Sequence, residues 1–451
     1  MIEHHEPWTM INGQSDKANV CIIDFELWRV NKGLTMSQKK LIVIGGGAAG
    51  FFCAVNAARF YPDMQVTLIE KTTKLLSKVK VSGGGRCNVT HACSSIAEMI
   101  RKYPRGDKFL KKAFHHFFIS DTIDWFETRN VVLKTEQDGR MFPVSDNSQT
   151  IIDCLLLEAQ KYNVEIIMNT QVISIVKENN NWALHLPGNK ILNTDFICIA
   201  CGGFSKAGQF SWLTDTGHTI ETPAPSLFTF NMPQNPITSL MGITVEQVSI
   251  KIAGTDFKES GALLITHWGL SGPAVLKLSA WGAKELAIKN YHFSIFINWI
   301  PSYNEITVRE KIQEVRFESA PQKIINRNPF SLPARLWEYF LQQCGINQNM
   351  RWADLPAKEQ NKLIRILCTQ EFEIKGKTTF KEEFVTAGGI RLQEVDVDTM
   401  QSKIVKGLFF AGEILDIDGI TGGYNFQSAW TTGWLAARGV GAAEKFESRQ
   451  K

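Results

Sequence analysis

The sequence predicts an α/β fold whose parallel sheet is formed from both ends of the chain and is interrupted by a long inserted region. Two similar patterns support this prediction: a buried strand, a glycine-rich turn and a helix occur at 41–60 and again at 407–440. Between them, several segments alternate apolar and polar residues, as antiparallel strands do. An insertion explains why the two glycine motifs lie more than 350 residues apart in sequence.

Length and composition limit the kind of protein. A chain of 451 residues suggests two or three domains, and 44% apolar with 21% charged residues is typical of a globular protein with a large core. The net charge of +4 is small for a protein that coats nucleic acid, although it allows a local basic patch. Nine cysteines without disulfide or zinc spacing indicate a reducing cytoplasm. We expect no membrane span, because no apolar run approaches about 20 residues.

Residues 1–35 differ from the rest of the chain. They lack the basic, apolar and cleavage regions of a signal peptide. Met36 is followed by SQKKLIVIGGG, a common beginning for a nucleotide-binding domain. Two interpretations of this N-terminal extension stay open: an upstream translation artefact or loosely attached arm, and a genuine accessory segment.

The first glycine motif has the context that a dinucleotide requires. Residues 41–44 form an apolar, β-branched strand, and the turn GGGAAG leads into a predicted helix at 51–60. In this pattern the first glycine permits the tight turn, the second lets a pyrophosphate approach the backbone, and the third lets helix and strand pack closely. Free N–H groups at the helix start also favour phosphate. The turn residues assigned to the cofactor are Gly45, Gly47, Ala48, Ala49 and Gly50.

A second predicted strand, QVTLIE, ends at Glu70, which follows Gly50 by 20 residues. At that distance an acidic side chain binds the ribose hydroxyls of an adenosine, and we assign the neighbouring Lys71 to the same site. Both strands, the helix and the acid are in register, so the sequence predicts a bound dinucleotide. These residues alone do not distinguish FAD from NAD.

The C-terminal pattern, GLFFAGEILDIDGITGGYNFQSAW at 407–430, predicts FAD. An enzyme that binds only NAD needs no second glycine-bearing loop, whereas the isoalloxazine of a flavin lies far from the adenine and requires its own binding loop. Polar groups after the strand can bond the ribityl chain. N–H groups at the helix start can face the flavin N1/C2=O edge and stabilise the charge of the reduced ring. The residues expected in these roles are Gly412, Glu413, Asp416, Gly423, Tyr424 and Asn425.

Several longer motifs carry a resemblance to a known family. They are KVKVSGGGRCNVT, GRMFPVSD, THWGLSGPAVLKLS and FVTAGGIRLQEVDVDTMQSK, the last of which precedes the GLFFAGEILDIDG segment. With these motifs the chain, from about Met36 to its C-terminus, resembles the HI0933-like flavoprotein family of NAD(P)/FAD-dependent, aminoacetone-oxidase-like oxidoreductases. Members of that family are connected with the reduction of conjugated C=C bonds, in steroid-like bile-acid intermediates and in a uracil of ribosomal RNA.

The resemblance implies a domain organisation. A Rossmann-type FAD-binding domain is interrupted by a β-barrel-like substrate domain, which itself carries a small helical insertion. The implied boundaries are 36–206 and 378–451 for the FAD domain, 207–308 and 369–377 for the substrate domain, and 309–368 for the helical insertion. The chain departs from the family after Gly202 and Gly203, where FSKAGQFSWLTDTGH stands in place of a Ser-Tyr-Pro segment and a Gly-Asp-Gly. This departure weakens any transfer of substrate identity.

Local patterns fill in the middle of the chain. Residues 105–125 form a basic and aromatic helical stretch, whose spacing indicates a core-facing stripe before it indicates a nucleic-acid or membrane surface. Residues 164–192 predict antiparallel strands with a turn at 187–189, and residues 309–368 predict helices.

The loop GGGRCN is expected to lie over the flavin. Its glycines permit close contact, and Arg86 and Asn88 supply charge and a hydrogen bond. Cys87 and Cys93 have C-x5-C spacing, which differs from the C-x4-C of flavin disulfide reductases, and no second dinucleotide motif for NADPH follows. Cys87 is therefore either a small structural residue or a proton donor to the substrate. The further cofactor residues assigned are Gly84, Gly85, Val172, Gly202 and Gly203.

His267 is the second acid/base candidate, with a structural histidine at a domain junction as the equal alternative. The sequence favours an FAD-dependent oxidoreductase that transfers hydride through flavin N5, with NAD(P)H as transient donor, and that reduces an activated C=C bond in a small or steroid-like substrate. One alternative is a flavoprotein that reduces uridine in rRNA, for which the basic region 78–112 provides a footprint. Another is an amine oxidase. No metal site is expected, and the sequence sets no oligomeric state.

Overall fold

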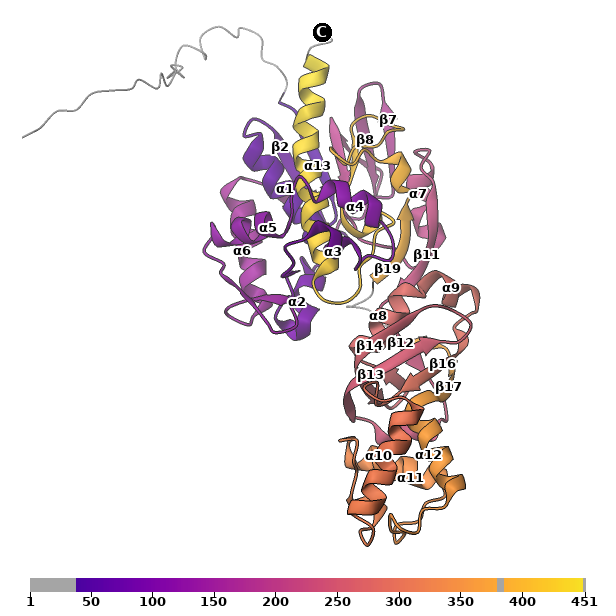
Figure 1. The fold of residues 1–451 in the computed structure, drawn as a ribbon. Coiled ribbons are helices and arrows are strands. Elements are labelled where there is room, and N and C mark those ends of the chain that lie inside the picture. The colour runs from indigo at the N-terminus through magenta and orange to yellow at the C-terminus, as the bar shows by residue number, and fades with distance from the viewer. Residues whose placement is uncertain (1–37, 379–384, 449–451) are drawn as a thin grey trace, which may run out of the picture. The chain divides into compact units, whose positions relative to one another are not determined.

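The computed structural model describes residues 38–378 and 385–448, with side chains up to residue 443. Contacts within the chain separate residues 1–38 from residues 39–451, and all helices and strands below belong to the second part (Figure 1). The predicted N-terminal extension at 1–35 lies outside the described residues.

A five-stranded parallel sheet forms where the two predicted strand–turn–helix patterns meet. Its order is β20-β10-β1-β2-β6, and every neighbouring pair is parallel. The strands are β1 (Lys40–Ile44), β2 (Gln65–Ile69), β6 (Glu165–Ile167), β10 (Phe196–Ile199) and β20 (Leu408–Phe410). The apolar side chains of β1 and β10 are buried, as in a sheet covered on both faces. Both ends of the chain share one sheet, which confirms the predicted Rossmann-type fold.

The prediction of antiparallel strands from residue 164 onward is wrong at its start. β6 joins the parallel sheet beside β2, with Thr67 opposite Glu165. The helix before it, α6 (Ser148–Lys161), supplies the crossover that a parallel connection requires. The antiparallel meander starts one strand later and consists of β7 (Ser174–Glu178), β8 (Asn181–Leu186) and β9 (Lys190–Thr194).

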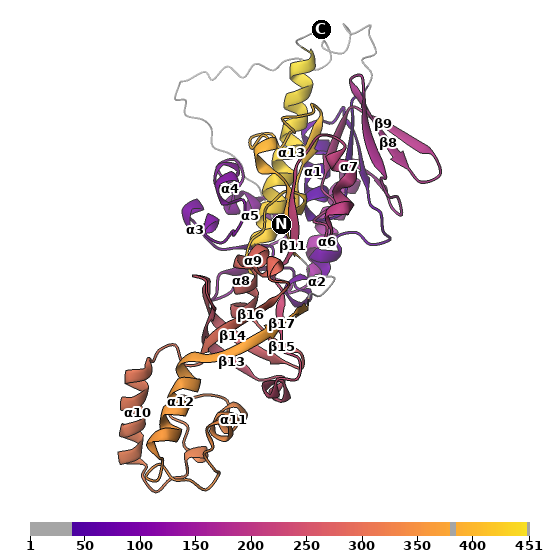
Figure 2. The ribbon, with the colours of Figure 1, turned by 90° about the vertical axis from the view of Figure 1, so that its right-hand side faces the viewer.

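Two helices follow the two glycine motifs and pack against each other. They are α1 (Ala48–Phe60) and α13 (Tyr424–Ser448), and both views show them side by side (Figure 1, Figure 2). Gly433 of α13 permits this close approach, because a Cβ atom there would lie 2.7 Å from the carbonyl oxygen of Ala49. One helix pair therefore supports both glycine motifs.

A small antiparallel sheet and four short helices lie between β2 and α6 along the chain. The sheet has the order β3-β5-β4, and the predicted helical stretch at 105–125 forms two helices, α4 and α5. Phe114 and Phe117 between them are buried, as the core-facing interpretation of this stretch expects. The elements are α2 (Ser77–Gly85), β3 (Thr90–His91), α3 (Ile96–Ile100), α4 (Asp107–Ala113), α5 (Ile119–Glu127), β4 (Leu133–Thr135) and β5 (Arg140–Pro143).

The inserted region contains a seven-stranded antiparallel sheet. Its order is β17-β16-β13-β14-β15-β12-β18. The two edge strands follow each other in sequence with Gly376 between them, so the sheet curls, but its described ladders do not close into a barrel. The strands are β12 (Thr229–Asn231), β13 (Thr244–Ile252), β14 (Lys258–Thr266), β15 (Gly269–Ser271), β16 (His292–Asn298), β17 (Gln370–Lys375) and β18 (Lys377–Thr378).

Helices complete this second region. Figure 2 shows α10, α11 and α12 grouped beyond the strands, and their apolar side chains share one hydrophobic cluster with the sheet, including Trp299 and Trp337. A separate cluster fills the space around the parallel sheet. The predicted domain boundaries stay a prediction. The helices are α8 (Pro273–Trp281), α9 (Ala283–Ile288), α10 (Glu305–Glu318), α11 (Ala334–Cys344) and α12 (Ala357–Thr369).

The remaining strands connect the two regions. β11 (Ile220–Ser226) pairs antiparallel with β19 (Val385–Ile390), so it lies outside the seven-stranded sheet. None of the described helices combines the length and the apolar character needed to span a membrane. Within the same residues, no group of three or more His, Cys, Asp or Glu side chains is arranged to hold a metal ion.

Candidate functional site

The turn between β1 and α1 has the geometry that the glycine motif predicts. Gly45 has a φ of +118°, and a Cβ atom there would lie 2.4 Å from the carbonyl oxygen of Ala200. A Cβ at Gly50 would lie 1.9 Å from the carbonyl oxygen of Gly45. At Gly47, in contrast, a Cβ would meet no atom of the described chain within 4 Å. The open side of the turn is therefore at Gly47, where the motif expects a pyrophosphate.

Glu70 lies just after β2 and is held against the same turn. Its Oε2 accepts a hydrogen bond from the N–H of Gly46 at 2.9 Å, and its Oε1 accepts from the N–H and hydroxyl of Thr72 at 2.9 and 2.8 Å. These bonds fix the carboxylate where a ribose-binding acid is expected. Lys71 is exposed beside it, with Nζ 5.8 Å from the centre of the Phe204 ring.

The carboxyl ends of β10 and β20 bring together a second group of residues. A Cβ on Gly203 would lie 2.5 Å from Thr386 Oγ1 and 3.1 Å from Glu413 Oε1. The hydroxyl of Thr386 is buried and has no hydrogen-bond partner among the described residues. The adjacent Gly202, with a φ of +77°, borders open space. A buried hydroxyl without a partner at this edge is the kind of group that a bound ligand satisfies.

Glu413 and Asp416, which are predicted to bond the ribityl chain, each contact a lysine side chain. Glu413 Oε2 accepts from Lys78 Nζ at 2.6 Å, and its Oε1 accepts from the N–H of Thr386 at 2.8 Å. Asp416 Oδ1 lies 3.5 Å from Lys284 Nζ of α9. Val172 is half-buried after β6 and packs against the core of the parallel sheet. The roles of these residues toward a cofactor stay predictions.

The segment 82–93, here called the 82–93 loop, leaves α2 along an irregular path. Gly83, Gly84 and Gly85 have φ values of +59°, +70° and +85°, which glycine adopts without strain. A Cβ at Gly84 or Gly85 would meet no described atom within 4 Å. The loop therefore exposes bare backbone to open space, as a loop lying against a flat ring requires.

Arg86 and Asn88 make contacts within the protein. Arg86 Nη1 donates to Glu136 Oε1 at 2.6 Å, and the guanidinium lies 3.9 Å from the centre of the Phe142 ring. With its amide oriented to satisfy both groups, the oxygen of Asn88 accepts from the N–H of Gly423 at 3.0 Å. The 82–93 loop and the start of α13 are thus joined directly.

Cys87 is fully buried, and burial raises the pKa of its thiol to about 12. Its φ of +63° is unusual for a residue with a side chain, and its N–H donates to the carbonyl oxygen of Ser82 at 3.0 Å. Cys93 is half-buried and also a free thiol, with Sγ donating to the carbonyl oxygen of Ser95 at 3.2 Å. This environment supports the structural interpretation of Cys87 over the proton-donor interpretation.

His91, in the same loop, contacts the second glycine motif. Its Nδ1 lies 3.0 Å from the carbonyl oxygen of Gly422, so Nδ1–H donates and Nε2 carries the lone pair of the neutral ring. The ring stacks on Tyr424, with centres 4.7 Å apart. Gly139 leaves room for it, since a Cβ there would lie 2.6 Å from Nε2.

The groups around His91 shift its pKa in both directions. Burial is the main cause that lowers its pKa, and the positive charges of Lys102 and Lys277 lower it further. The carbonyl of Gly422 and the carboxylate of Asp138 raise it. The net effect lowers the pKa of His91, and the charged groups around the ring come from three segments of the chain.

His267 has a different position. It is exposed on the turn between β14 and β15, where its ring centre lies 4.0 Å from that of Trp268. The start of α13 is instead held by Tyr103, whose hydroxyl donates to the carbonyl oxygen of Tyr424 at 2.7 Å, and by the Asn425 side chain. An acid/base role for His267 stays a prediction.

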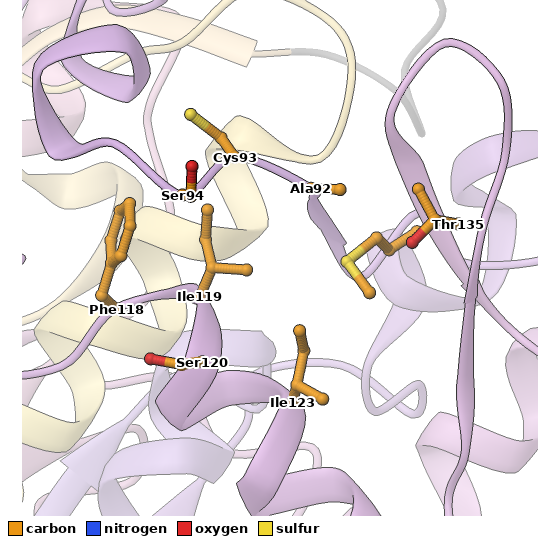
Figure 3. Close-up of a pocket in the computed structure, with 9 residues that line it drawn as sticks. Ala92, Cys93, Ser94, Phe118, Ile119, Ser120, Ile123 and Thr135 are labelled. Carbon is orange, nitrogen blue, oxygen red and sulfur yellow. The ribbon is translucent and has the colours of Figure 1, made fainter.

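A pocket of about 400 Å³ lies next to the 82–93 loop (Figure 3). Residues 92–94 line one side, and the beginning of α5 lines the other with Phe118, Ile119 and Ser120. Most of its wall is apolar, with hydroxyl groups from Ser94, Ser120 and Thr135. The first residue of its lining, Ala92, directly follows His91 in sequence.

The residues present fit both the pyrophosphate part and the flavin part of an FAD molecule. Gly47 and Gly202 present open backbone at the edge of the parallel sheet, and Gly84 and Gly85 do so in the 82–93 loop. The buried hydroxyl of Thr386, next to Gly203, offers a hydrogen bond that no described residue uses. Two glycine motifs that flank one sheet edge define a flavoprotein with a Rossmann-type FAD-binding fold.

Comparison with known proteins gives the family. The family model described as "HI0933-like protein Rossmann domain" matches residues 39–439. The chain belongs to this HI0933-like family, which confirms the resemblance carried by its motifs.

Curated relatives are similar along almost the whole chain. The ribosomal RNA dihydrouridine synthase of Escherichia coli (strain K12) is 32% identical over 419 residues, covering 91% of this chain and 100% of the relative. The enzyme of the same name from Haemophilus influenzae is 29% identical, covering 90% and 99%. The 3-dehydro-bile acid delta(4,6)-reductase of Clostridium scindens is 27% identical, covering 90% and 100%. The chain is thus an FAD-dependent oxidoreductase by family.

Two residues of the site were not singled out from the sequence. His91 directly follows the KVKVSGGGRCNVT motif, four residues after Cys87, and its position after the glycine loop was the available signal. Thr386 stands in FVTAGGI, where a hydroxyl in an otherwise apolar strand was a weaker signal. Both became visible only through contacts with segments more than 180 residues away, at Gly422 and Gly203.

Proposed function

We propose that this protein uses NAD(P)H to reduce the C5=C6 bond of a uridine in ribosomal RNA. The observation that carries the proposal is the similarity to the E. coli ribosomal RNA dihydrouridine synthase, at 32% identity over the full length of that relative. A second relative of the same name, from H. influenzae, supports it. The sequence favoured a small or steroid-like substrate, whereas the substrate proposed here is RNA. The predicted reaction, reduction of a C=C bond, is the same.

The reaction needs a hydride on one carbon and a proton on the other. When bound, FAD would supply the hydride chemistry between NAD(P)H and the uracil. Glu70 would hold the ribose of the cofactor, and Gly47 would leave room for its pyrophosphate. The overall balance is one NAD(P)H and one solvent proton consumed for each uridine reduced.

We infer that His91 relays this proton through Nε2. Its Nδ1–H is fixed on the carbonyl of Gly422, so the ring is oriented with Nε2 as the exchangeable position. The half-buried ring belongs to the 82–93 loop, whose residues 83–88 are expected at the flavin edge. Cys87 is less suited, because burial raises its pKa to about 12 and leaves its side chain without solvent contact.

Two variants separate these candidates. Cys87→Ser is expected to keep FAD bound and turnover within about twofold of the parent. His91→Asn keeps an N–H donor for Gly422 but lacks Nε2, so turnover should fall about 10²-fold with FAD still bound. Flavin absorbance measures occupancy and single-turnover kinetics measure the rate. If the serine variant loses turnover and the asparagine variant does not, the thiol is the donor.

The direct test of the proposed function uses a strain that lacks the gene. Its rRNA should contain less dihydrouridine, measured by mass spectrometry of nucleosides, and a plasmid copy should restore the level. Anaerobic stopped-flow mixing should show NADH or NADPH bleaching the flavin. An unchanged dihydrouridine content in the deletion strain would refute the uridine assignment.

A second candidate function is reduction of a conjugated C=C bond in a steroid-like molecule. The similarity to the bile acid reductase, at 27% identity over 90% of this chain, favours it. It predicts oxidation of NAD(P)H by a conjugated steroid enone in the absence of RNA. Rapid reoxidation of the flavin by O₂ with an amine as substrate would instead support the oxidase alternative.

A further inference from the structure

One exposed surface carries positive charge that no ion pair with a described residue neutralises. It consists of Arg101 and Lys102 after α3, and Lys108, Lys111 and Lys112 of α4, and is called here the α3–α4 surface. All five side chains are exposed, and none forms an ion pair with a described residue. From residue 99 to residue 118 the chain has six Lys or Arg and a single acidic residue, Asp107.

The α3–α4 surface is rigidly connected to the second glycine motif. The carbonyl oxygen of Lys102 accepts from the N–H of Ile420 at 2.9 Å. Arg105, between α3 and α4, forms a buried ion pair with Asp418, and Tyr103 donates to Tyr424. A polyanion on this surface is therefore held at a fixed position relative to residues 418–424.

The same surface also lies near His91. Lys102 is close enough that its positive charge lowers the pKa of His91, as is Lys277 from α8 on another side. Along the chain, the acidic residues from the start of α3 to the middle of α5 are Glu98, Asp107, Asp121 and Asp124, and Asp398 pairs with His116 just after α4. A substrate that carried only one or two charges would not need five unpaired cations, whereas an RNA backbone carries one phosphate per nucleotide.

We propose that the α3–α4 surface binds the phosphate backbone of the RNA substrate. This inference rests on the proposed function and names the contact surface for it. Backbone contacts of this kind position an RNA without reading its sequence, and they make affinity depend on salt. Selection of the target uridine then falls to other residues and to the shape of the RNA.

The experiment uses the FAD-loaded full chain and two matched variants. One replaces Lys108, Lys111 and Lys112 of α4 with glutamine. The control replaces three exposed cations of α12 with glutamine, at Lys358, Lys362 and Arg365. Both variants lose the same charge from one helix, so a general loss of positive charge affects them equally. The probe is a fluorescent oligouridylate of about 12 nucleotides, titrated at several salt concentrations.

The α4 variant should bind the oligouridylate at least tenfold more weakly. The slope of log affinity against log salt should decrease in magnitude by about 2, since each lost contact to a single strand contributes about 0.7. The α12 variant should match the parent. Equal losses in both variants, or an α4 variant that binds like the parent, would overturn the proposal. Flavin absorbance confirms that each variant is loaded.

A complementation arm separates this inference from the proposed function. If the parent restores dihydrouridine to the deletion strain and the α4 variant restores it equally well, the function stands and the surface is wrong. If the parent restores nothing because the deletion changes nothing, the uridine function is wrong, whatever the binding data. Restoration by the parent and the α12 variant alone supports both.

Discussion

Gly47→Ala should weaken FAD binding at least tenfold and leave the apoprotein as stable as the parent. The backbone at Gly47 has a φ of −93°, which alanine adopts freely, and a Cβ there would meet no described atom within 4 Å. The free energy of unfolding of the apoprotein should therefore change by no more than about 0.5 kcal/mol. A pyrophosphate that approaches this backbone would meet the new methyl group, which accounts for the lost affinity.

Gly50→Ala is the matched control in the same motif. Its Cβ would lie 1.9 Å from the carbonyl oxygen of Gly45, and neither backbone can move without disturbing β1 and α1. We expect the apoprotein itself to lose about 3 kcal/mol or more. Thermal unfolding of the apoproteins and fluorescence titration with FAD measure the two effects. If Gly47→Ala binds FAD like the parent, the cofactor does not pass over this turn.

The contrast between the two glycines explains what the sequence predicted well. A strand, a tight turn and a helix follow from neighbouring residues, so the spacing of Gly45, Gly47, Gly50 and Glu70 was enough to predict this strand–turn–helix and the strand that ends before Glu70, while their contacts with a dinucleotide stay a prediction. The C-terminal motif was informative for the same reason. In both, a strand, a glycine-bearing turn and a helix follow one another within a short segment, which local spacing can indicate.

Strand partners were harder to predict, because a strand pattern does not state which neighbour it pairs with. Residues 165–167, with one glutamate and two isoleucines, suit either kind of sheet, and the crossover through α6 makes the connection to β2 parallel. The inserted sheet was predicted as barrel-like, and among the described residues its ladders remain open although Gly376 joins the two edge strands. Pairing depends on the path of the whole chain.

The candidate proton relay shows the same limit within the site. His91, Gly139 and Gly422 come from three segments, and no local spacing relates them. The sequence singled out Cys87 and His267 because of the motifs around them. The structure buries the first and exposes the second, and burial and exposure both depend on long-range packing.

Arg105→Met should destabilise the protein by about 3–5 kcal/mol at pH 7.5, because it leaves a buried carboxylate without its counter-charge. Asp418 is fully buried, and Arg105 contacts it through Nε and Nη2 while also donating to the carbonyl oxygen of Ala280 at 2.8 Å. Ser226 Oγ donates to Asp418 Oδ2 at 2.7 Å and remains as the neutral partner. The pair joins the segment before α4, the second glycine motif, β11 and α8.

The pH dependence identifies the mechanism of this loss. Burial raises the pKa of Asp418 above its ordinary value, while Arg105 opposes that rise, so removing Arg105 raises the pKa further. The folded variant then binds a proton that the unfolded chain has released, and its free energy of unfolding falls as the pH rises between the unfolded and folded pKa values. The defect of Arg105→Met should therefore be smaller at pH 5 than at pH 7.5 in urea unfolding.

The double variant Arg105→Met/Asp418→Asn, which has no charge to bury, should recover stability at pH 7.5 and lose this pH dependence. A defect of equal size at both pH values, unrelieved in the double variant, would mean that lost packing and not the unpaired charge destabilises the fold.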